Sequence, residues 1–453
     1  MTGQATPSAA APTKAPGPRG SFLWGNLADF QQDAIGFLTQ AVHDHGDIVR
    51  LRFGPITAHL VNRPEYAEHI LAGAVGRYDK QTRSVARIRA TCGDSLLSSE
   101  GPAWLRHRRL IQPVFQPRFF ESLGPTIDDV IGDTLNRWQD LASRQQDIAI
   151  VSEMMRLTMT IAARILFTAE IEKDSEVIER ALAVILEDTW RRIEAPVDLA
   201  SISPRFHRPR FRRALQDIDR IVYRIIEQRR SGGSQHDDLL SRLLAAHQTQ
   251  AEAGLSDQEL RDACVTLLLA GHETTANALT WTFFLISQHP EVELKLHEEG
   301  VQFESTRNAT QTQMAFSEAI RLYPSIWIIE RRAMADDRIG GFAIPRGSMV
   351  LTSPYLLHRH AEFWSEPERF DPTRFTPPNI ASRPRHAYLP FGIGPHKCIG
   401  EHMALTVATH IVARTLSRFQ LSVVPGQTIK TLPGITLRHA GELRMKLKPI
   451  PCN

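Results

Sequence analysis

One segment of the chain, residues 257–288, has the pattern of a helix that is too long and too apolar for a protein surface. Ser256 and Glu259 form the capping-box pattern that begins a helix, and no proline interrupts the segment. Residues 264–270 are apolar on every side of the helix except at Thr266. A helix that is apolar all round is buried. The segment is therefore expected to cross the interior of a large, mostly helical protein.

The rest of the chain predicts shorter elements around this helix. They are a helix near 34–42 that ends at Gly46, a hairpin over 49–61, mostly helix over 102–288, a helix that ends at 322–323, small sheet elements over 336–352 and a last helix beginning near 398. The fold class predicted is mainly α with a minor β portion. Residues 1–20 are rich in Ala, Pro, Gly and Thr and predict a flexible tail, and residues 21–453 predict a single domain.

Composition excludes several classes of protein. The net charge is only +3 over 453 residues, so no global basic excess points to nucleic acid. No run of about 18 apolar residues and no signal peptide is present, which predicts a cytoplasmic protein without a membrane span. The cysteines, Cys92, Cys264, Cys398 and Cys452, are too scattered for a disulfide framework or a zinc site. One of them is still able to act as a reactive or ligating thiol.

Residues 391–400 form the most informative motif, Phe-Gly-x-Gly-x-His-x-Cys-x-Gly around Cys398. Cys398 lies just before a predicted helix, whose N-terminal amides favour an anionic thiolate. The glycines let the backbone approach a planar group closely and direct amides at the sulfur. The simpler alternative is an inert, buried cysteine in a glycine-rich turn.

This loop resembles that of the cytochrome P-450 haem-thiolate monooxygenases, and the resemblance extends from about Gly25 to the C-terminus. It implies the cytochrome P-450 fold with the long helix over the cofactor, haem b (iron protoporphyrin IX). It also implies that Cys398 is the iron ligand and that Phe391, Gly394 and Gly400 contact the haem. The chain is similar to the soluble bacterial type, with no N-terminal anchor, no flavin domain after Cys398 and a short stretch over 300–313.

A second motif is Glu318-Ala-Ile-Arg321, whose acid and guanidinium lie one helical turn apart and are able to pair. Such a pair alone is most often a solvated surface bridge. The resemblance implies instead a structural pair behind the haem, joined by a second arginine. Arg369 and Arg374 both lie in a Pro-x-Arg-Phe sequence and are candidates for this second arginine. The wider frame from Trp364 to Phe375 favours Arg374, which leaves Arg369 as a surface charge.

Further cofactor-binding residues follow from the same resemblance. Trp104 and Arg108 lie one helical turn apart and are expected to reach a haem propionate, although a basic surface helix has the same pattern. Arg331 and His396 are also expected to contact propionates. Arg332 beside Arg331 makes that choice of arginine the less certain one.

The centre of the long helix contains Gly271, Glu273, Thr274 and Thr275, which are poor choices for the middle of a helix. Residues of low helix propensity in the middle of a helix are typical of functional sites. His272-Glu273 begins like a zinc-protease motif, but Ala276 replaces its second histidine.

The resemblance implies that Gly271 leaves room over the iron, that Thr274 stabilises dioxygen there and that Glu273 relays protons. Thr275 is expected to point away. The structural alternatives are a threonine bonded to the preceding turn and a glutamate in a salt bridge.

The resemblance also indicates the substrate and the electron source. The substrate pocket is expected to be lined by residues 84–97, 190–203, 325–328 and 435–436 and by Leu268 and Ala270. Because these residues are mostly apolar, they predict a hydrophobic small-molecule substrate such as a fatty acid, terpenoid or polyketide. Five arginines between 205 and 213 are expected to begin a solvated helix, with a membrane or an anionic carrier protein as the alternative.

Electrons are expected from a ferredoxin or flavodoxin with an NAD(P)H-dependent reductase, which would dock on positive charge from Arg106, His107, Arg109 and Lys397. The predicted activity is insertion of one oxygen atom from dioxygen by hydroxylation or epoxidation. Two alternatives remain: a haem-thiolate isomerase or dehydratase, which would not need Glu273 and Thr274, and a non-enzymatic haem-binding sensor.

Overall fold

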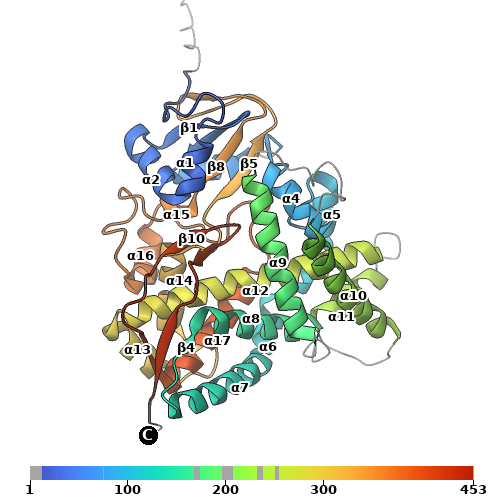
Figure 1. Ribbon diagram of the computed structural model, residues 1–453, viewed down its shortest axis with the longest axis vertical. Helices are drawn as coiled ribbons and strands as arrows, with labels where there is room; N and C mark the ends of the chain where they lie inside the picture. Colours follow the sequence, from blue (N-terminus) through green and yellow to red (C-terminus); the bar gives the residue numbers. More distant parts are fainter. Residues whose placement is uncertain are drawn as a thin grey trace, which may run out of the picture.

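The computed structural model describes residues 13–74, 76–167, 174–195, 208–231, 238–249 and 255–451. Helices form most of the described part, as predicted, and Figure 1 shows them gathered below a small sheet region. The α-helices are α1 (Leu27–Gln32), α2 (Ala34–His45), α3 (Pro64–Glu68), α4 (Arg83–Cys92), α5 (Gly101–Ile111), α6 (Pro117–Ser122), α7 (Gly124–Ser143), α8 (Ile150–Phe167), α9 (Ser175–Glu194), α10 (Pro209–Ser231), α11 (Leu239–Thr249), α12 (Asp257–Ser287), α13 (Pro290–Val301), α14 (Thr310–Leu322), α15 (Pro354–Leu357), α16 (Pro377–Ser382) and α17 (Glu401–Arg418). Shorter helical turns are η1 (His69–Gly73), η2 (Gln112–Val114), η6 (Thr306–Asn308) and η7 (Pro372–Phe375).

The strands form small sheets at the edge of the helical part. They are β1 (Ile48–Phe53), β2 (Ile56–Val61), β3 (Tyr78–Asp79), β4 (Ile148–Ala149), β5 (Ile329–Ala333), β6 (Asp337–Ile339), β7 (Phe342–Ile344), β8 (Met349–Thr352), β9 (Phe419–Val423), β10 (Thr431–Pro433), β11 (Leu437–His439) and β12 (Arg444–Pro449). The five-stranded sheet has the order β1-β2-β8-β5-β3, with only β2 and β8 parallel. β12 pairs with β4 and β9, and β6-β7 and β10-β11 are two-stranded sheets. The predicted hairpin is confirmed as β1 and β2.

The prediction of a flexible tail over residues 1–20 is wrong for residues 13–20. Ala15 is buried against the apolar side of the sheet region, and the carbonyl of Pro16 accepts a hydrogen bond of 2.6 Å from the amide of Arg50. Thr13 pairs with Phe342 through a β-bridge. The segment is ordered because open strand edges of the sheet region accept its backbone, which composition alone does not reveal. Residues 1–12 lie outside the described residues.

Helix α12 begins at the capping box predicted for it. The Ser256 hydroxyl accepts from the amide of Glu259 at 3.2 Å, and the Glu259 carboxylate accepts from the amide of Ser256 at 2.7 Å. The helix then crosses the molecule, as Figure 1 shows in yellow-green, and it is buried on all sides. Within the described part of the chain, no helix has the length and the apolar character needed to span a membrane.

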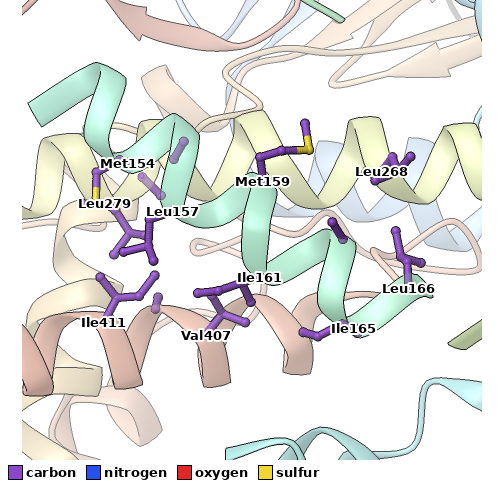
Figure 2. Close-up of a cluster of buried hydrophobic side chains, with 14 of the residues drawn as sticks. Met154, Leu157, Met159, Ile161, Ile165, Leu166, Leu268, Leu279, Val407 and Ile411 are labelled. Atoms are coloured by element: carbon purple, nitrogen blue, oxygen red, sulfur yellow. The ribbon is translucent and has the colours of Figure 1, made fainter. Parts of the chain in front are cut away.

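Helix α8 packs along α12 and shares an apolar cluster with α17 (Figure 2). Leu157 and Ile161 of α8 lie near Val407 and Ile411 of α17, while Leu279 comes from α12. Packing among these three helices therefore fixes their positions relative to one another.

Helix α4 is tied to the N-terminal part of α12 by polar contacts. The Arg261 guanidinium donates to the carbonyl of Thr91 at 2.9 Å and to the carboxylate of Asp219 on α10 at 2.7 Å. The Asp262 carboxylate accepts from the backbone amide of Asp94 at 3.0 Å. Both Arg261 and Asp262 are buried, so these contacts are shielded from water.

Candidate functional site

The predicted cysteine motif forms a tight loop directly before α17. The amide of Cys398 donates to the carbonyl of Phe391 at 2.9 Å, which closes the loop. Gly394 has a φ of +73°, and a Cβ at this position would lie 2.2 Å from the carbonyl oxygen of Leu71. Gly394 is therefore required by both backbone conformation and space.

Cys398 presents its thiol to an internal cavity. Its side chain is accessible from the cavity although protein surrounds it, so burial raises the pKa of the thiol. The amide of Gly400 and the positive charges of Arg108 and Lys397 act in the opposite direction and lower that pKa. A bound metal ion would complete the deprotonation, because a coordinating thiol loses its proton outright.

The cavity has a volume of about 440 Å³ and lies between the cysteine loop and α12. Apolar side chains from α4, α8, α9 and α12 contribute to its wall, together with residues of the cysteine loop, α14 and α17. Of the predicted substrate segments, residues 88, 91, 92, 96 and 97, Ala270, Ser325, Ile326, Ile435 and Thr436 line it. Residues 196–203 lie outside the described residues.

Several predicted lining positions do not border the cavity, including Trp190 and Ile328, and two others show why. Leu268 lies in the apolar cluster of Figure 2, while its neighbours Leu267 and Leu269 border the cavity. Trp327 is buried against the sheet region instead of the cavity. In both cases the family position gave the right segment, and the rotation of the backbone decided which side chain faces inward.

Cationic groups gather on one side of the cavity. Trp104, Arg108, Arg331 and His396, all predicted cofactor-binding residues, line it together with Lys80. The rings of Trp104 and His396 lie 4.2 Å apart. The Nδ1 atom of His396 is buried and has no hydrogen-bond partner among the described residues.

Sequence reasoning missed Lys80. Its ammonium donates to the carbonyl of Leu96 at 2.6 Å, and its amide donates to the carboxylate of Glu100 at 2.7 Å. Burial lowers the pKa of Lys80 to about 8, and burial together with Lys80, Arg331 and Arg108 lowers the pKa of His396 to about 3. The cationic donors thus repel one another, and a planar group carrying carboxylates would fit among them.

The centre of α12 faces the same cavity. Gly271, Glu273 and Thr274 all line it, and the Thr274 hydroxyl donates to the carbonyl of Ala270 at 2.7 Å. Thr275 also lines the cavity. Its orientation away from the iron stays a prediction.

Glu273 is buried at one edge of the cavity, where burial raises the pKa of its carboxyl. The Thr436 hydroxyl donates to it at 2.8 Å, and Asn277 donates to Thr436 at 3.2 Å. The Arg438 guanidinium lies 3.9 Å from the carboxylate, with 34% of its side chain exposed. A chain of polar groups therefore leads from the cavity towards solvent.

Glu318 and Arg321 form an ion pair whose side chains are both fully buried, with contacts of 2.7 and 2.8 Å. Arg321 also donates to the carbonyls of His358, Pro367 and Arg369. Arg374 lies 3.3 Å from the Glu318 carboxylate, whereas the side chain of Arg369 is 63% exposed and pairs with Glu366.

The four predicted docking charges differ in exposure. Arg106 and His107 contact the Glu259 carboxylate at the start of α12, and His107 is buried. Arg109 is exposed, and Lys397 pairs with Glu401 at 2.5 Å. The prediction is wrong for His107, because the rotation of α5 turns it inward, and for the partly exposed Arg106 it stays a prediction.

Comparisons with known proteins agree with this geometry. A family model described as Cytochrome P450 matches residues 15–446. The chain is 33% identical to cyclooctatin synthase of Streptomyces melanosporofaciens over 96% of this chain and 95% of the relative. It is 35% identical to cyclooctat-9-en-7-ol 5-monooxygenase of the same organism over 85% and 84%. It is also 31% identical to pentalenene oxygenase of Streptomyces avermitilis over 89% and 90%. The chain belongs to the cytochrome P450 family of haem-dependent monooxygenases.

Proposed function

We propose that this protein hydroxylates or epoxidises a hydrophobic terpenoid, using dioxygen and electrons from a separate redox protein. The observation that carries the proposal is the Cys398 thiol facing an apolar cavity whose opposite wall carries Glu273 and Thr274. The names of the relatives support the terpenoid class, since they describe oxygenation of cyclooctatin-type compounds and of pentalenene.

The cofactor proposed is haem b, held by Cys398 at the iron and by Trp104, Arg108, Arg331, His396 and Lys80 at the propionates. When bound, it supplies the activation of dioxygen. The unpaired Nδ1 of His396 supports this fit, because a propionate would give it the partner it lacks, whereas the Glu100 carboxylate lies 3.6 Å from the other ring nitrogen. Lys80, Arg108 and Arg331 lower the pKa of His396, and two carboxylates would offset this positive charge. Phe391, Gly394 and Gly400 would border the same group.

Glu273 and Thr274 are proposed to deliver protons. The Thr274 hydroxyl uses its hydrogen on Ala270, so its lone pairs are free to accept from a water molecule in the cavity. Glu273 has a raised pKa and contacts Thr436 near the partly exposed Arg438, which suits a group that gains and loses a proton.

Substitution of Thr274 with alanine tests this role. The variant should still bind haem, substrate and carbon monoxide, because none of these steps needs the hydroxyl. Electron consumption should continue. A larger share of the oxygen consumed should leave as hydrogen peroxide, because the Thr274 hydroxyl no longer positions the water molecule that delivers protons. Product and peroxide are measured per electron consumed.

Thr280→Ala is the control, because its hydroxyl bonds to Ala276 away from the cavity. Equal peroxide release from the wild type and Thr274→Ala, with a well-coupled substrate, would leave Thr274 as a packing residue only.

Substitution of Lys80 tests whether the cationic residues hold the haem propionates. Lys80→Gln should release haem to apomyoglobin about tenfold faster, because a charge-assisted hydrogen bond contributes roughly 1.5–3 kcal/mol. The exposed Lys430→Gln serves as the control. An unchanged rate of haem loss in Lys80→Gln would mean that this ammonium does not reach the cofactor.

The electron donor proposed is a ferredoxin or flavodoxin with an NAD(P)H-dependent reductase, and the exposed Arg109 supports docking of an acidic partner. A surrogate ferredoxin system tests the whole proposal. Substrate-dependent consumption of dioxygen, with isotopically labelled oxygen recovered in the product, is expected. Turnover without oxygen uptake would indicate an isomerase or dehydratase, and ligand binding without turnover would indicate a sensor.

A further inference from the structure

Three buried hydroxyl groups border the cavity and have no partner. Thr91 on α4, Thr189 on α9 and Thr266 on α12 are 2%, 2% and 4% exposed. All three line the cavity, and none of their Oγ1 atoms makes a hydrogen bond within the described part of the chain. A buried hydroxyl without a partner is unfavourable, so these groups call for a ligand or a water molecule.

The missing partners are unusual for threonines in helices, which ordinarily donate to the carbonyl four residues earlier. Thr158, Thr274, Thr280 and Thr282 do so, at 2.7 to 2.9 Å. Thr91, Thr189 and Thr266 do not make this bond. The other buried threonines without partners among the described residues, Thr312, Thr352 and Thr415, do not line the cavity. Within the described part of the chain, Thr91, Thr189 and Thr266 are thus the cavity-lining threonines whose buried hydroxyls lack a partner.

The fold brings these hydroxyls to the side of the cavity formed by α4, α9 and the first half of α12. Cys92, next to Thr91, lies beside the Thr266 hydroxyl, and a thiol is too weak a hydrogen-bonding group to satisfy it. Thr189 comes from α9, which packs against α4. Contacts of α4 with both α9 and α12 therefore place the three hydroxyls on one side of the cavity.

Helical geometry gives the distance from this subsite to the reaction centre. Thr266, Ala270 and Thr274 are spaced by four residues, lie on one face of α12 and all line the cavity. At 1.5 Å per residue, Thr266 precedes Thr274 by about 12 Å along the axis. A molecule held at Thr266 would thus be oxidised at a carbon on the order of 10 Å away.

The charge distribution restricts the group that binds. The cationic side chains among the lining residues, Lys80, Arg108, Arg331 and Lys397, belong to the side near Trp104 and the cysteine loop. Near the hydroxyls the described helical lining is apolar, because Ile88 lies one turn before Thr91 and Ile185 one turn before Thr189. The nearby Arg261, which donates to the carbonyl of Thr91, is already paired with Asp219 and Asp262. A buried carboxylate there would have no counterion of its own, which is costly, whereas a neutral oxygen is matched by hydroxyl donors.

We propose that Thr91, Thr189 and Thr266 bind a neutral hydroxyl or carbonyl group of the substrate. The protein would then act on a terpenoid that already carries an oxygen function, so a reaction that introduces that oxygen must come before it. This inference rests on the proposed terpenoid oxidation, which it makes more specific.

Equilibrium binding to the haem-loaded protein tests the subsite. The ligands are abietadiene, abietinol, abietinal and abietic acid, which share one skeleton, and cedrene with cedrol as a second, smaller pair. Binding is followed by haem absorption and by calorimetry. The alcohols and the aldehyde should bind about tenfold more tightly than the hydrocarbons, which corresponds to about 1.4 kcal/mol, and the acid should bind worst.

Thr266→Val removes the hydroxyl while keeping the shape of the side chain. It should weaken alcohol binding about tenfold and leave hydrocarbon binding within about twofold. Thr266→Ser should keep the preference, and so should the control Thr280→Val, because that hydroxyl bonds to Ala276 and does not line the cavity.

Equal binding of alcohol and hydrocarbon on both skeletons, or no binding of any ligand, contradicts the proposal and leaves the hydroxyls to ordered water. A uniform loss in Thr266→Val does the same. The carbon monoxide spectrum and oxygen uptake separate the two levels of inference. If both are typical of a monooxygenase while the preference is absent, only the subsite is wrong; if the thiolate band is absent, the proposed function itself fails.

Discussion

Replacing Cys398 with alanine should abolish the thiolate band in the carbon monoxide difference spectrum of the reduced, haem-loaded protein. The sulfur lies in the cavity wall, where it is able to donate electron density to the iron as a thiolate. Cys92 also lines the cavity, but burial raises the pKa of its thiol to about 11, which disfavours a thiolate there. Monooxygenase activity should be lost with the band. Haem binding itself should weaken but persist in part, because the cationic side of the cavity is unchanged.

The matched control is Cys264→Ala, since Cys264 is buried but does not line the cavity. It should keep the band, and Cys92→Ala and Cys452→Ala should do the same. Retention of an unshifted thiolate band in Cys398→Ala would remove this residue as the ligand.

The second large effect is expected at the buried ion pair of α14. Glu318→Ala or Arg321→Ala leaves one charge in the interior without its partner, at a cost of about 3–5 kcal/mol. That is a large part of the free energy of unfolding of an ordinary domain. We expect a marked loss of soluble protein and of haem content, measured by thermal unfolding and by haem absorbance.

Arg374 and Arg369 provide an internal comparison within the same loop. Arg374→Ala should also destabilise, though less, because Glu318 keeps Arg321, whereas Arg369→Ala should change stability by less than about 0.5 kcal/mol. If Arg369→Ala were the more damaging change, the pairing of Glu318 with Arg374 would not be what holds this loop.

The sequence was most informative where the determinants of structure are local. The capping box at Ser256 and Glu259 begins α12 where predicted, and Gly394 of the cysteine motif has the positive φ that favours glycine. Both depend on residue types and backbone chemistry that a sequence displays directly. The close approach of Leu71 to Gly394 is a long-range contact, which the sequence does not display.

Contacts between distant segments were predicted less well. Lys80 reaches the cationic side of the cavity from a segment with no motif, and nothing in the sequence distinguishes it from its charged neighbours Arg77, Asp79 and Arg83. Arg106 and His107 belong to the right helix but face Glu259, and Leu268 faces the core while its neighbours face the cavity. A difference of one residue is a rotation of about 100°, which a motif does not specify.

The contacts between α4 and α12 also bear on how fast ligands exchange. A separation of α4 from α12 would break the contact of Arg261 with the carbonyl of Thr91 and that of Asp262 with the amide of Asp94. Because Arg261 and Asp262 are buried, each broken contact would leave a polar group without a hydrogen-bond partner in the protein interior. Openings along this edge must therefore be rare events compared with the motions of exposed loops. A bound molecule seated beside Thr91 accordingly has a long residence time, and its departure is gated by the protein rather than by the weakness of its own contacts.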